Sequence, residues 1–227
     1  MNIALIVAAG SGTRMGNIEK PKQFLLVNDK PLLLYSAQAF NNHPEVDSIV
    51  IVTNKVFVPD VKEICKSFNL SKVKTIVSGG ETRQQSVYNG LRAINGKAED
   101  IIIIHDAARP LISPRIITDN INGCKLYDAV ETAIKATDTI IKSEDKEKIS
   151  DIPNRKDLYQ TQTPQTFKYD LILKAHEQAM KNNLPDVTDD AKLVMALGKE
   201  IHLVEGDKLN FKITTSEDLT LLKALLK

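Results

Sequence analysis

The sequence predicts an α/β protein in which helices cover both faces of a mostly parallel β-sheet. Four apolar, β-branched runs carry this prediction, because such runs are typical of strands buried on both faces. Helix-like segments separate the runs, and strands that alternate with helices form crossover units with parallel strands. The 227 residues, 42% of them hydrophobic, can build a sizeable core. We therefore expect a Rossmann-like sheet in a single domain spanning residues 1–227.

The first two thirds of the chain supply this alternation. Strands are expected at Asn2–Ala8, Ser48–Asn54, Val73–Gly79 and Asp100–Asp106, with a weaker one at Tyr127–Ala136. Helices are expected between them, at Leu32–Phe40, Pro59–Phe68, Thr82–Ile94 and Pro114–Cys124. Pro59 and Pro114 suit the first position of a helix, where no N–H is needed. Ligands of such a sheet gather at the carboxyl ends of its strands, so the chemistry is expected after Ala8, Gly79 and Ile104.

The stretch from Asp138 to Pro164 has a different pattern. Apolar and polar residues alternate on either side of a charged turn at Ser143–Lys148, which predicts an exposed β-hairpin. We expect this hairpin to leave the sheet as an arm at about residues 137–163. The elements expected after the arm are helices at Tyr169–Asn182, Val187–Leu197 and Ser216–Leu226, and a strand pair at Glu200–Glu205 and Asn210–Thr214. Thr188 and Asp189 are expected to cap the second helix, and "SEDL" is a capping pattern for the last.

Composition and missing motifs exclude several classes of function. Lys and Arg number 30 against 29 Asp and Glu, whereas a nucleic-acid-binding protein usually has a strong basic excess. Cys65 and Cys124 are far apart in the sequence and have no His at metal-binding spacing, so neither a zinc site nor a disulfide is expected. Two free cysteines fit a protein of the reducing cytoplasm. The apolar run at the N-terminus is too short for a signal peptide or membrane span. No G-x-S-x-G, H-E-x-x-H or C-x-x-C motif occurs.

A glycine-rich segment, "AAGSGTRMG" at residues 8–16, follows the first expected strand. Its spacing, G-x-G-x-x-x-G, matches neither the dinucleotide fingerprint nor the P-loop. Its backbone N–H groups suit a phosphate chain, and the nearby Arg14, Lys20 and Lys22 could neutralise charge that builds up during phosphoryl transfer. From these residues alone, a tight turn with solvated charges is an equally good interpretation.

Two further motifs stand at strand ends. In "HDAARP", Asp106 could orient a hydroxyl or help hold a phosphate-bound magnesium ion, and Arg109 could bind a phosphate. An Asp–Arg pair that only caps the sheet edge is the alternative, and His105 is expected to be a packed structural residue. In "GGETRQQS", Arg83 and Ser86 could face a base or ribose from the first turn of a helix, with a plain helix cap as the alternative.

Taken together, the motifs resemble those of the 2-C-methyl-D-erythritol 4-phosphate cytidylyltransferases and the related ribitol 5-phosphate cytidylyltransferases. Any one motif is weak, but seven in order over essentially the whole chain are specific. They are "AAGSGTRMG…PKQF" at 8–24, "GGETRQQSV" at 79–87, "HDAARP" at 105–110, "DTI" at 138–140, "QTPQTF" at 162–167, "TDDA" at 188–191 and "FKITTSEDL" at 211–219.

The resemblance implies a nucleotide-diphospho-sugar transferase-like fold and an enzyme that condenses CTP with a polyol phosphate, releasing pyrophosphate. It implies that the triphosphate lies on Ala8, Ala9, Gly10, Ser11 and Gly12, and that cytosine and ribose are read by Gly80, Ser86 and Ala107. The catalytic residues it implies are Arg14 and Lys22, which would stabilise the α-phosphate. The acceptor phosphate would be surrounded by Asp106, Arg109, Thr139, Arg155 and Lys212. Mg²⁺ would be bound mainly through the CTP phosphates, with no metal ligand assigned in the chain.

The same resemblance implies a cytoplasmic homodimer in which the arm crosses to the partner, so that Thr139 and Arg155 serve the neighbouring site. No membrane or nucleic-acid partner is expected. The preferred acceptor is methylerythritol phosphate, in non-mevalonate isoprenoid biosynthesis, because "HDAARP" and "TDDAKLV" look like that branch. The alternative is ribitol 5-phosphate, converted to CDP-ribitol for cell-surface polymers, because "YDAVET" and "GNIEKPKQF" look closer to that one.

Two rival interpretations lie outside these families. A regulator that kept the fold but lost catalysis would lack Arg14 or Lys22, and both are present. A plain sugar nucleotidyltransferase would share the glycine loop but would not predict the arm or "QTPQTF".

Overall fold

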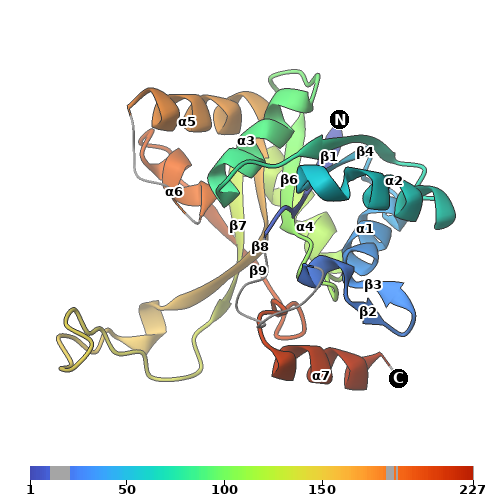
Figure 1. The fold of residues 1–227 in the computed structure, drawn as a ribbon. Helices are drawn as coiled ribbons and strands as arrows, with labels where there is room; N and C mark the ends of the chain where they lie inside the picture. The colour runs from blue at the N-terminus through green and yellow to red at the C-terminus, as the bar shows by residue number, and fades with distance from the viewer. Residues whose placement is uncertain (11–20, 183–186, 188, 227) are drawn as a thin grey trace.

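The computed structural model describes residues 1–10, 21–182, 187 and 189–226. Within them, a central seven-stranded sheet has the strand order β5-β4-β1-β6-β8-β7-β9 (Figure 1). The bounds of these strands are β1 Asn2–Ala8, β4 Ser48–Thr53, β5 Val73–Ser78, β6 Ile101–Asp106, β7 Ala129–Lys135, β8 Tyr159–Lys168 and β9 His202–Glu205. The first five expected strands are therefore confirmed, with ends that differ by at most two residues.

The sheet is mostly parallel, as the sequence predicts. Strand β1 pairs in parallel with both β4 and β6, and β4 pairs in parallel with β5. Strand β8 runs antiparallel to its neighbours β6 and β7, while β9 is parallel to β7. The chain thus moves outward from β1 to β5 and then returns to the other side of β1 at β6. Such a switch point opens a crevice at the carboxyl ends of the strands.

Helices cover both faces, because alternate side chains of each strand point to opposite faces. In β1, Ala4 and Ile6 join the core under one set of helices, whereas Ile3 and Leu5 join the core under the other. The first face carries α1 Leu32–Asn42, α2 Val58–Ser67 and α4 Pro114–Tyr127. The second face carries α3 Arg83–Ala93, α5 Tyr169–Lys181 and α6 Asp190–Met195. None of the helices in the described ranges is long and apolar enough to cross a membrane.

A third, smaller core lies at the end of the sheet where the strand-end motifs are found. It joins a short hairpin, β2 Leu26–Val27 and β3 Lys30–Pro31, to the C-terminal helix α7 Ser216–Leu225. Val27, Ile213 and Leu222 are fully buried in it. Thr215 and Asp218 form a capping box at the start of α7, as the "SEDL" pattern predicts. In the described ranges, three single-turn 3₁₀ helices complete the elements: η2 Lys22–Phe24, η3 Lys55–Phe57 and η4 Arg155–Asp157.

Two expectations about the C-terminal third are wrong. Asn210–Thr214 is not a strand, because its hydrogen bonds go elsewhere: the Ile213 N–H donates to the Ala108 carbonyl oxygen at 2.8 Å. Strand β9 pairs with β7 instead. The expected helix from Val187 begins only at Asp190, with Asp189 as its N-cap, accepting the Ala191 N–H at 2.8 Å. The other expected cap, Thr188, lies outside the described residues.

The expected arm is present, but the hairpin is less regular than its sequence suggests. Antiparallel pairing of β7 and β8 reaches Lys135 and Tyr159, and residues 136–158 then project from the body with one isolated bridge between Lys142 and Asp151 (Figure 1). The "QTPQTF" motif does not belong to the exposed hairpin, because β8 carries it into the central sheet, where it is buried. Four exposed isoleucine side chains lie on the arm: Ile140, Ile141, Ile149 and Ile152.

Candidate nucleotide and acceptor site

The motifs after β1 and β6 meet because these strands are hydrogen-bonded neighbours. Val7 pairs with Asp106, and the Ala107 N–H donates to the Val7 carbonyl oxygen at 3.0 Å. The "HDAARP" turn is closed by the Arg109 N–H, which donates to the Asp106 carbonyl oxygen at 3.0 Å. The beginning of the glycine-rich segment therefore lies beside Asp106 and Ala107, at the switch point of the sheet.

A buried glutamine holds the start of the glycine-rich segment. The Gln23 side chain is 3% exposed, and its Nε2 donates to the carbonyl oxygens of Ala8 at 2.6 Å and Gly10 at 3.1 Å. With these carbonyls bonded to Gln23, the backbone of residues 8–10 has a fixed path as it leaves β1. Gln23 belongs to the "PKQF" motif, and its role in holding these carbonyl groups could not be predicted from the sequence.

The loop after β5 packs directly against this segment. A Cβ on Gly79 would come within 2.5 Å of the Ala9 Cβ, so glycine is required for the close approach. Ser86, on the first turn of α3, accepts the Gly80 N–H at 3.1 Å and donates to the Thr82 carbonyl oxygen at 2.8 Å. Ser86 is buried, and its hydroxyl shapes the loop that carries Gly80.

Asp106 is a buried carboxylate between cations. Its Oδ2 lies 2.6 Å from the Lys212 Nζ, and its Oδ1 lies 3.5 Å from the Arg83 Nε. Burial alone would raise the pKa of this carboxyl, but Arg83, Lys212 and Arg109 outweigh burial and hold the pKa well below its usual range. Asp106 is therefore an anion at every ordinary pH, and a fixed hydrogen-bond acceptor.

A strap of residues 210–213 brings Lys212 to Asp106. The Arg109 guanidinium donates to the Asn210 carbonyl oxygen at 2.8 Å, and the Lys22 Nζ donates to the Ile213 carbonyl oxygen at 2.7 Å. Together with the bond from Ile213 to Ala108, these contacts fasten the strap across the "HDAARP" turn. Arg109 and Lys212 thereby lie near the Asp106 carboxylate, and Lys22 is held on the same strap, which makes this end of the sheet suited to anionic substrates.

Comparison with protein families shows which family has this sequence and this arrangement of strand-end residues. The model of the family "2-C-methyl-D-erythritol 4-phosphate cytidylyltransferase" matches residues 2–227. The chain belongs to this cytidylyltransferase family. Among its relatives, the 2-C-methyl-D-erythritol 4-phosphate cytidylyltransferase of Clostridium novyi (strain NT) is 43% identical over 227 residues, which cover 100% of this chain and 96% of the relative. The enzyme of the same name from Clostridium botulinum (strain Langeland) is 43% identical over 226 residues, covering 100% of this chain and 97% of the relative.

Solved structures of the family share the fold of this cytidylyltransferase. The 4-diphosphocytidyl-2C-methyl-D-erythritol synthase from Anaerococcus prevotii superposes with a TM-score of 0.85 at 30% identity, covering 99% of this chain and 97% of that one. The 2-C-methyl-D-erythritol 4-phosphate cytidylyltransferase of Francisella tularensis gives 0.83 at 31% identity, covering 99% of both chains.

The residues assigned from the sequence fall into three groups in the cytidylyltransferase. Those that meet at the strand ends are Ala8, Ala9, Gly10, Lys22, Gly80, Ser86, Asp106, Ala107, Arg109 and Lys212. Thr139 and Arg155 lie on the projecting arm, where the Arg155 guanidinium donates to the Thr137 carbonyl oxygen at 3.2 Å (Figure 1). Ser11, Gly12 and Arg14, together with Lys20, lie outside the described residues.

His105 is a packed residue, as expected. It is fully buried, its Nδ1 lies 3.0 Å from the Thr163 Oγ1, and its Nε2 lies 3.1 Å from the Arg109 carbonyl oxygen. Burial lowers its pKa to about 4, so the imidazole is neutral near pH 7. His105 thus supports the "HDAARP" turn from below.

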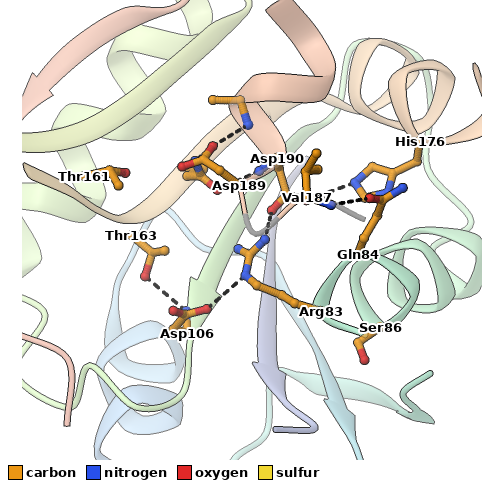
Figure 2. A network of polar contacts seen from close by, with 12 residues as sticks. Arg83, Gln84, Ser86, Asp106, Thr161, Thr163, His176, Val187, Asp189 and Asp190 are labelled. Carbon is orange, nitrogen blue, oxygen red and sulfur yellow. Dashed lines mark hydrogen bonds and ion pairs between the residues drawn. The ribbon is translucent and has the colours of Figure 1, made fainter. Parts of the chain in front are cut away.

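A chain of buried polar contacts, which could not be predicted from the sequence, lies behind Asp106. Arg83, expected to face a base or ribose, instead lies with its NH1 2.6 Å from the Asp190 Oδ2, and the Asp190 Oδ1 lies 3.0 Å from the His176 Nε2 (Figure 2). Asp190 belongs to the "TDDA" motif, from which only the family resemblance was inferred. An acidic residue at the start of an expected helix was the one feature of the sequence that could have pointed to a buried partner.

A second polar group lies behind the base of the arm. The Thr161 hydroxyl donates to Glu131, and the Gln165 Nε2 donates to the Glu131 Oε1 at 3.1 Å and to the Asp189 Oδ1 at 2.6 Å. One amide thus holds two carboxylates. Burial, with a smaller contribution from the charge of Asp189, raises the pKa of Glu131 to about 7.

We predict that Glu131→Gln stabilises the protein more at pH 8 than at pH 5. The folded protein keeps a proton on Glu131 up to about pH 7, whereas the unfolded chain releases it near the ordinary value of 4.5. The free energy of unfolding therefore falls as pH rises through this window, and the variant lacks this loss. After allowance for solvent screening, the gain between the two pH values is on the order of 1 kcal/mol.

Urea unfolding at both pH values measures this effect. The matched control is Glu200→Gln, at an exposed position, for which the difference from the parent protein should not depend on pH. A difference for Glu131→Gln that is equal at pH 5 and pH 8 contradicts the raised pKa.

Proposed function

We propose that this chain transfers the cytidylyl group of CTP to 2-C-methyl-D-erythritol 4-phosphate, giving the CDP-alcohol and pyrophosphate in non-mevalonate isoprenoid biosynthesis. The observation that carries the proposal is the family match over residues 2–227, which includes every candidate site residue. The relatives are named for methylerythritol phosphate, which supports this acceptor and not ribitol 5-phosphate. We propose the cytoplasm as the location, because Cys65 and Cys124 are both free thiols.

The reaction needs positioning and charge neutralisation rather than a side-chain base. A phosphate oxygen of the acceptor forms a bond to the α-phosphorus of CTP, and the bond from that phosphorus to the bridging oxygen breaks, releasing pyrophosphate. The acceptor oxygen is already an anion at neutral pH, so no proton has to be removed. Holding two anions in line and stabilising the additional charge at the α-phosphorus are the remaining tasks.

The two catalytic residues that we propose are Arg14 and Lys22. Lys22 stands at the start of η2, and its Nζ is anchored on the carbonyl oxygen of Ile213 in the strap. A cation held in advance costs little reorganisation when charge develops at the α-phosphorus. We assign the CTP phosphates to residues 8–12, and cytosine and ribose to Gly80, Ser86 and Ala107.

The acceptor would lie over the strap. Asp106, kept anionic by its neighbours, can accept hydrogen bonds from hydroxyl groups of the polyol. Lys212 and Arg109 supply positive charge for its phosphate, with Arg109 anchored through the Asn210 carbonyl oxygen.

We propose that Mg²⁺ is held mainly by CTP rather than by the chain. Among the described residues, no group of three or more His, Cys, Asp or Glu is arranged to hold a metal ion. Asp106 is already paired with Lys212 and Arg83, so phosphate oxygens and water suit the ion better as ligands. When bound, the ion would neutralise charge on the triphosphate, while Lys22 and Arg14 act on the α-phosphate.

We further propose that the chain, a single domain with a dimerisation arm at about residues 137–163, works as a homodimer. The arm carries Ile140, Ile141, Ile149 and Ile152 on its surface, and apolar groups of this kind are stabilised by burial against a partner. Thr139 and Arg155 belong to residues 136–158, which project from the body as the arm (Figure 1). Both residues would then complete the acceptor site of the partner.

The proposed acceptor is tested with purified protein, CTP, Mg²⁺ and either polyol phosphate, followed by pyrophosphate release and identification of the CDP-alcohol. We expect efficient turnover with 2-C-methyl-D-erythritol 4-phosphate and at least about 100-fold lower kcat/KM with ribitol 5-phosphate, because a site built to bind a particular set of hydroxyl groups discriminates strongly. Efficient turnover of ribitol 5-phosphate alone overturns the proposal.

Lys22→Ala should lower kcat about 100–1,000-fold at saturating CTP and acceptor, the usual effect of removing one preorganised donor aimed at transition-state charge. The control is Lys146→Ala in the turn of the arm, where the side chain is exposed and little change is expected. Comparable turnover in the two purified variants refutes the assignment of Lys22.

Sharing of sites between subunits predicts complementation. Lys22→Ala and Arg155→Ala should each be nearly inactive as homodimers. A mixed dimer, however, has one site with both Lys22 and Arg155 intact and one site that lacks both. After unfolding and refolding of an equal mixture, about a quarter of the parental activity should return, because about half the dimers are mixed. If the mixture stays as inactive as its components, the arm acts within its own chain or not at all.

A further inference from the structure

Arg83 is the residue through which the structure links Asp106 to the buried interior. Its guanidinium spans two carboxylates: NH1 lies 2.6 Å from the Asp190 Oδ2, and Nε lies 3.5 Å from the Asp106 Oδ1 (Figure 2). The shorter contact is with Asp190, whose side chain is 1% exposed. Arg83 is thus anchored behind the site and reaches forward to Asp106.

Asp190 is itself held from several sides. Its Oδ1 lies 3.0 Å from the Nε2 of His176, a fully buried side chain on α5, and its backbone N–H donates to the Gln165 Oε1 at 3.3 Å. Asp190 starts α6 directly after its N-cap, Asp189. Because His176 on α5 contacts the carboxylate and Gln165 on β8 accepts the backbone N–H of the same residue, the position of the Arg83 guanidinium is determined before any substrate binds.

Arg83 also opens α3, the helix that shapes the nucleotide loop. The Thr82 side chain caps α3 by accepting the Gln85 N–H at 3.1 Å. Ser86, on the first turn of α3, accepts the N–H of Gly80. The same helical turn therefore points one side chain at the proposed cytosine loop and another at the proposed acceptor carboxylate. Ser86 and Arg83 therefore contact different parts of the site, Gly80 and Asp106, from the same helical turn.

We propose that Arg83, anchored by Asp190 and His176, is a positioning residue for acceptor recognition: it fixes the Asp106 carboxylate for the polyol of the acceptor without touching the substrate. This proposal rests on the proposed function, since it assigns Asp106 to the acceptor. It separates two roles in α3, because Arg83 serves the acceptor through Asp106 while Ser86 serves the nucleotide loop.

The test begins with Arg83→Gln and Asp190→Asn, each compared with the parent protein in kcat, in KM for 2-C-methyl-D-erythritol 4-phosphate and in Kd for CTP by calorimetry. We expect KM for the acceptor to rise about 10- to 100-fold, because Arg83 is in contact with Asp106 and residues in contact are energetically coupled. Kd for CTP should change less than about threefold, because Ser86 and not Arg83 contacts the nucleotide loop. Arg83→Lys, which keeps the charge but not the fork, should recover part of the loss.

A double variant separates positioning from folding. Either single change breaks the 2.6 Å pair between Arg83 and Asp190, which is strongly destabilising, whereas Arg83→Gln with Asp190→Asn leaves a neutral pair at this contact. We expect the double variant to regain thermal stability and to keep the raised KM for the acceptor. If KM returns to the parental value together with stability, Arg83 has a structural role only and the proposal is wrong.

A thermodynamic cycle with Asp106→Asn locates the effect. Because Arg83 acts through Asp106, Arg83→Gln should add less than about twofold to the acceptor KM when Asp106→Asn is already present. The matched control is Arg92→Gln on the same helix, where the guanidinium makes a surface contact of 3.6 Å with Glu177, and no change in KM is expected. Additive effects of Arg83→Gln and Asp106→Asn overturn the proposal.

Failure of this inference can be told apart from failure of the proposed function. If the parent protein does not release pyrophosphate from CTP and 2-C-methyl-D-erythritol 4-phosphate, the function is wrong and the inference falls with it. If the parent turns over normally and Arg83→Gln weakens CTP binding as much as acceptor use, only the inference is wrong.

Discussion

The site depends on one feature of backbone pairing, the parallel registration of β1 with β4 on one edge and β6 on the other. Because both edges of β1 are occupied, the chain has to leave β1 outward on one side and return on the other. The two connections diverge and leave the strand ends open between them. Asp106 ends β6, and the glycine-rich segment begins where β1 ends. The sheet therefore places the proposed acceptor carboxylate beside the proposed triphosphate loop.

Electrostatics fix the site as firmly as the backbone does. Asp106 and Asp190 are buried, and the cations beside them are Arg83, Lys212 and Arg109. Taking charges out of water is costly unless they are paired and hydrogen-bonded, and breaking a buried pair costs about 3–5 kcal/mol. The ion pairs thus hold one another in place before substrate arrives. Lys212 and Arg109 also bring positive charge to the ends of the strands, which favours the binding of anions.

The sequence predicts the strands well because burial on both faces leaves a local signature, a continuous β-branched run. It fails at Asn210–Thr214, whose alternating pattern resembles a strand although its hydrogen bonds go to the Ala108 turn and to the start of α7. The strand-end residues Asp106 and Lys212 could be predicted together because family motifs contain both. The pairing of Arg83 with Asp190, 107 residues apart, could not, since neither residue signals its partner. The roles of Thr139 and Arg155 depend on a second chain and stay predictions.

The strap of residues 210–213 has a consequence for how the protein is made. Asp106 and Arg109 are translated more than a hundred residues before the groups that hold them, the Lys212 ammonium and the Asn210 carbonyl oxygen. At about 5–20 residues per second, several seconds separate the two events. During that interval the Asp106 carboxylate lacks its shorter ion pair, the one with Lys212, and the Arg109 guanidinium lacks its anchor on Asn210. A ribosome that stalls before Asn210 leaves a chain with most of its sheet but no strap across the "HDAARP" turn.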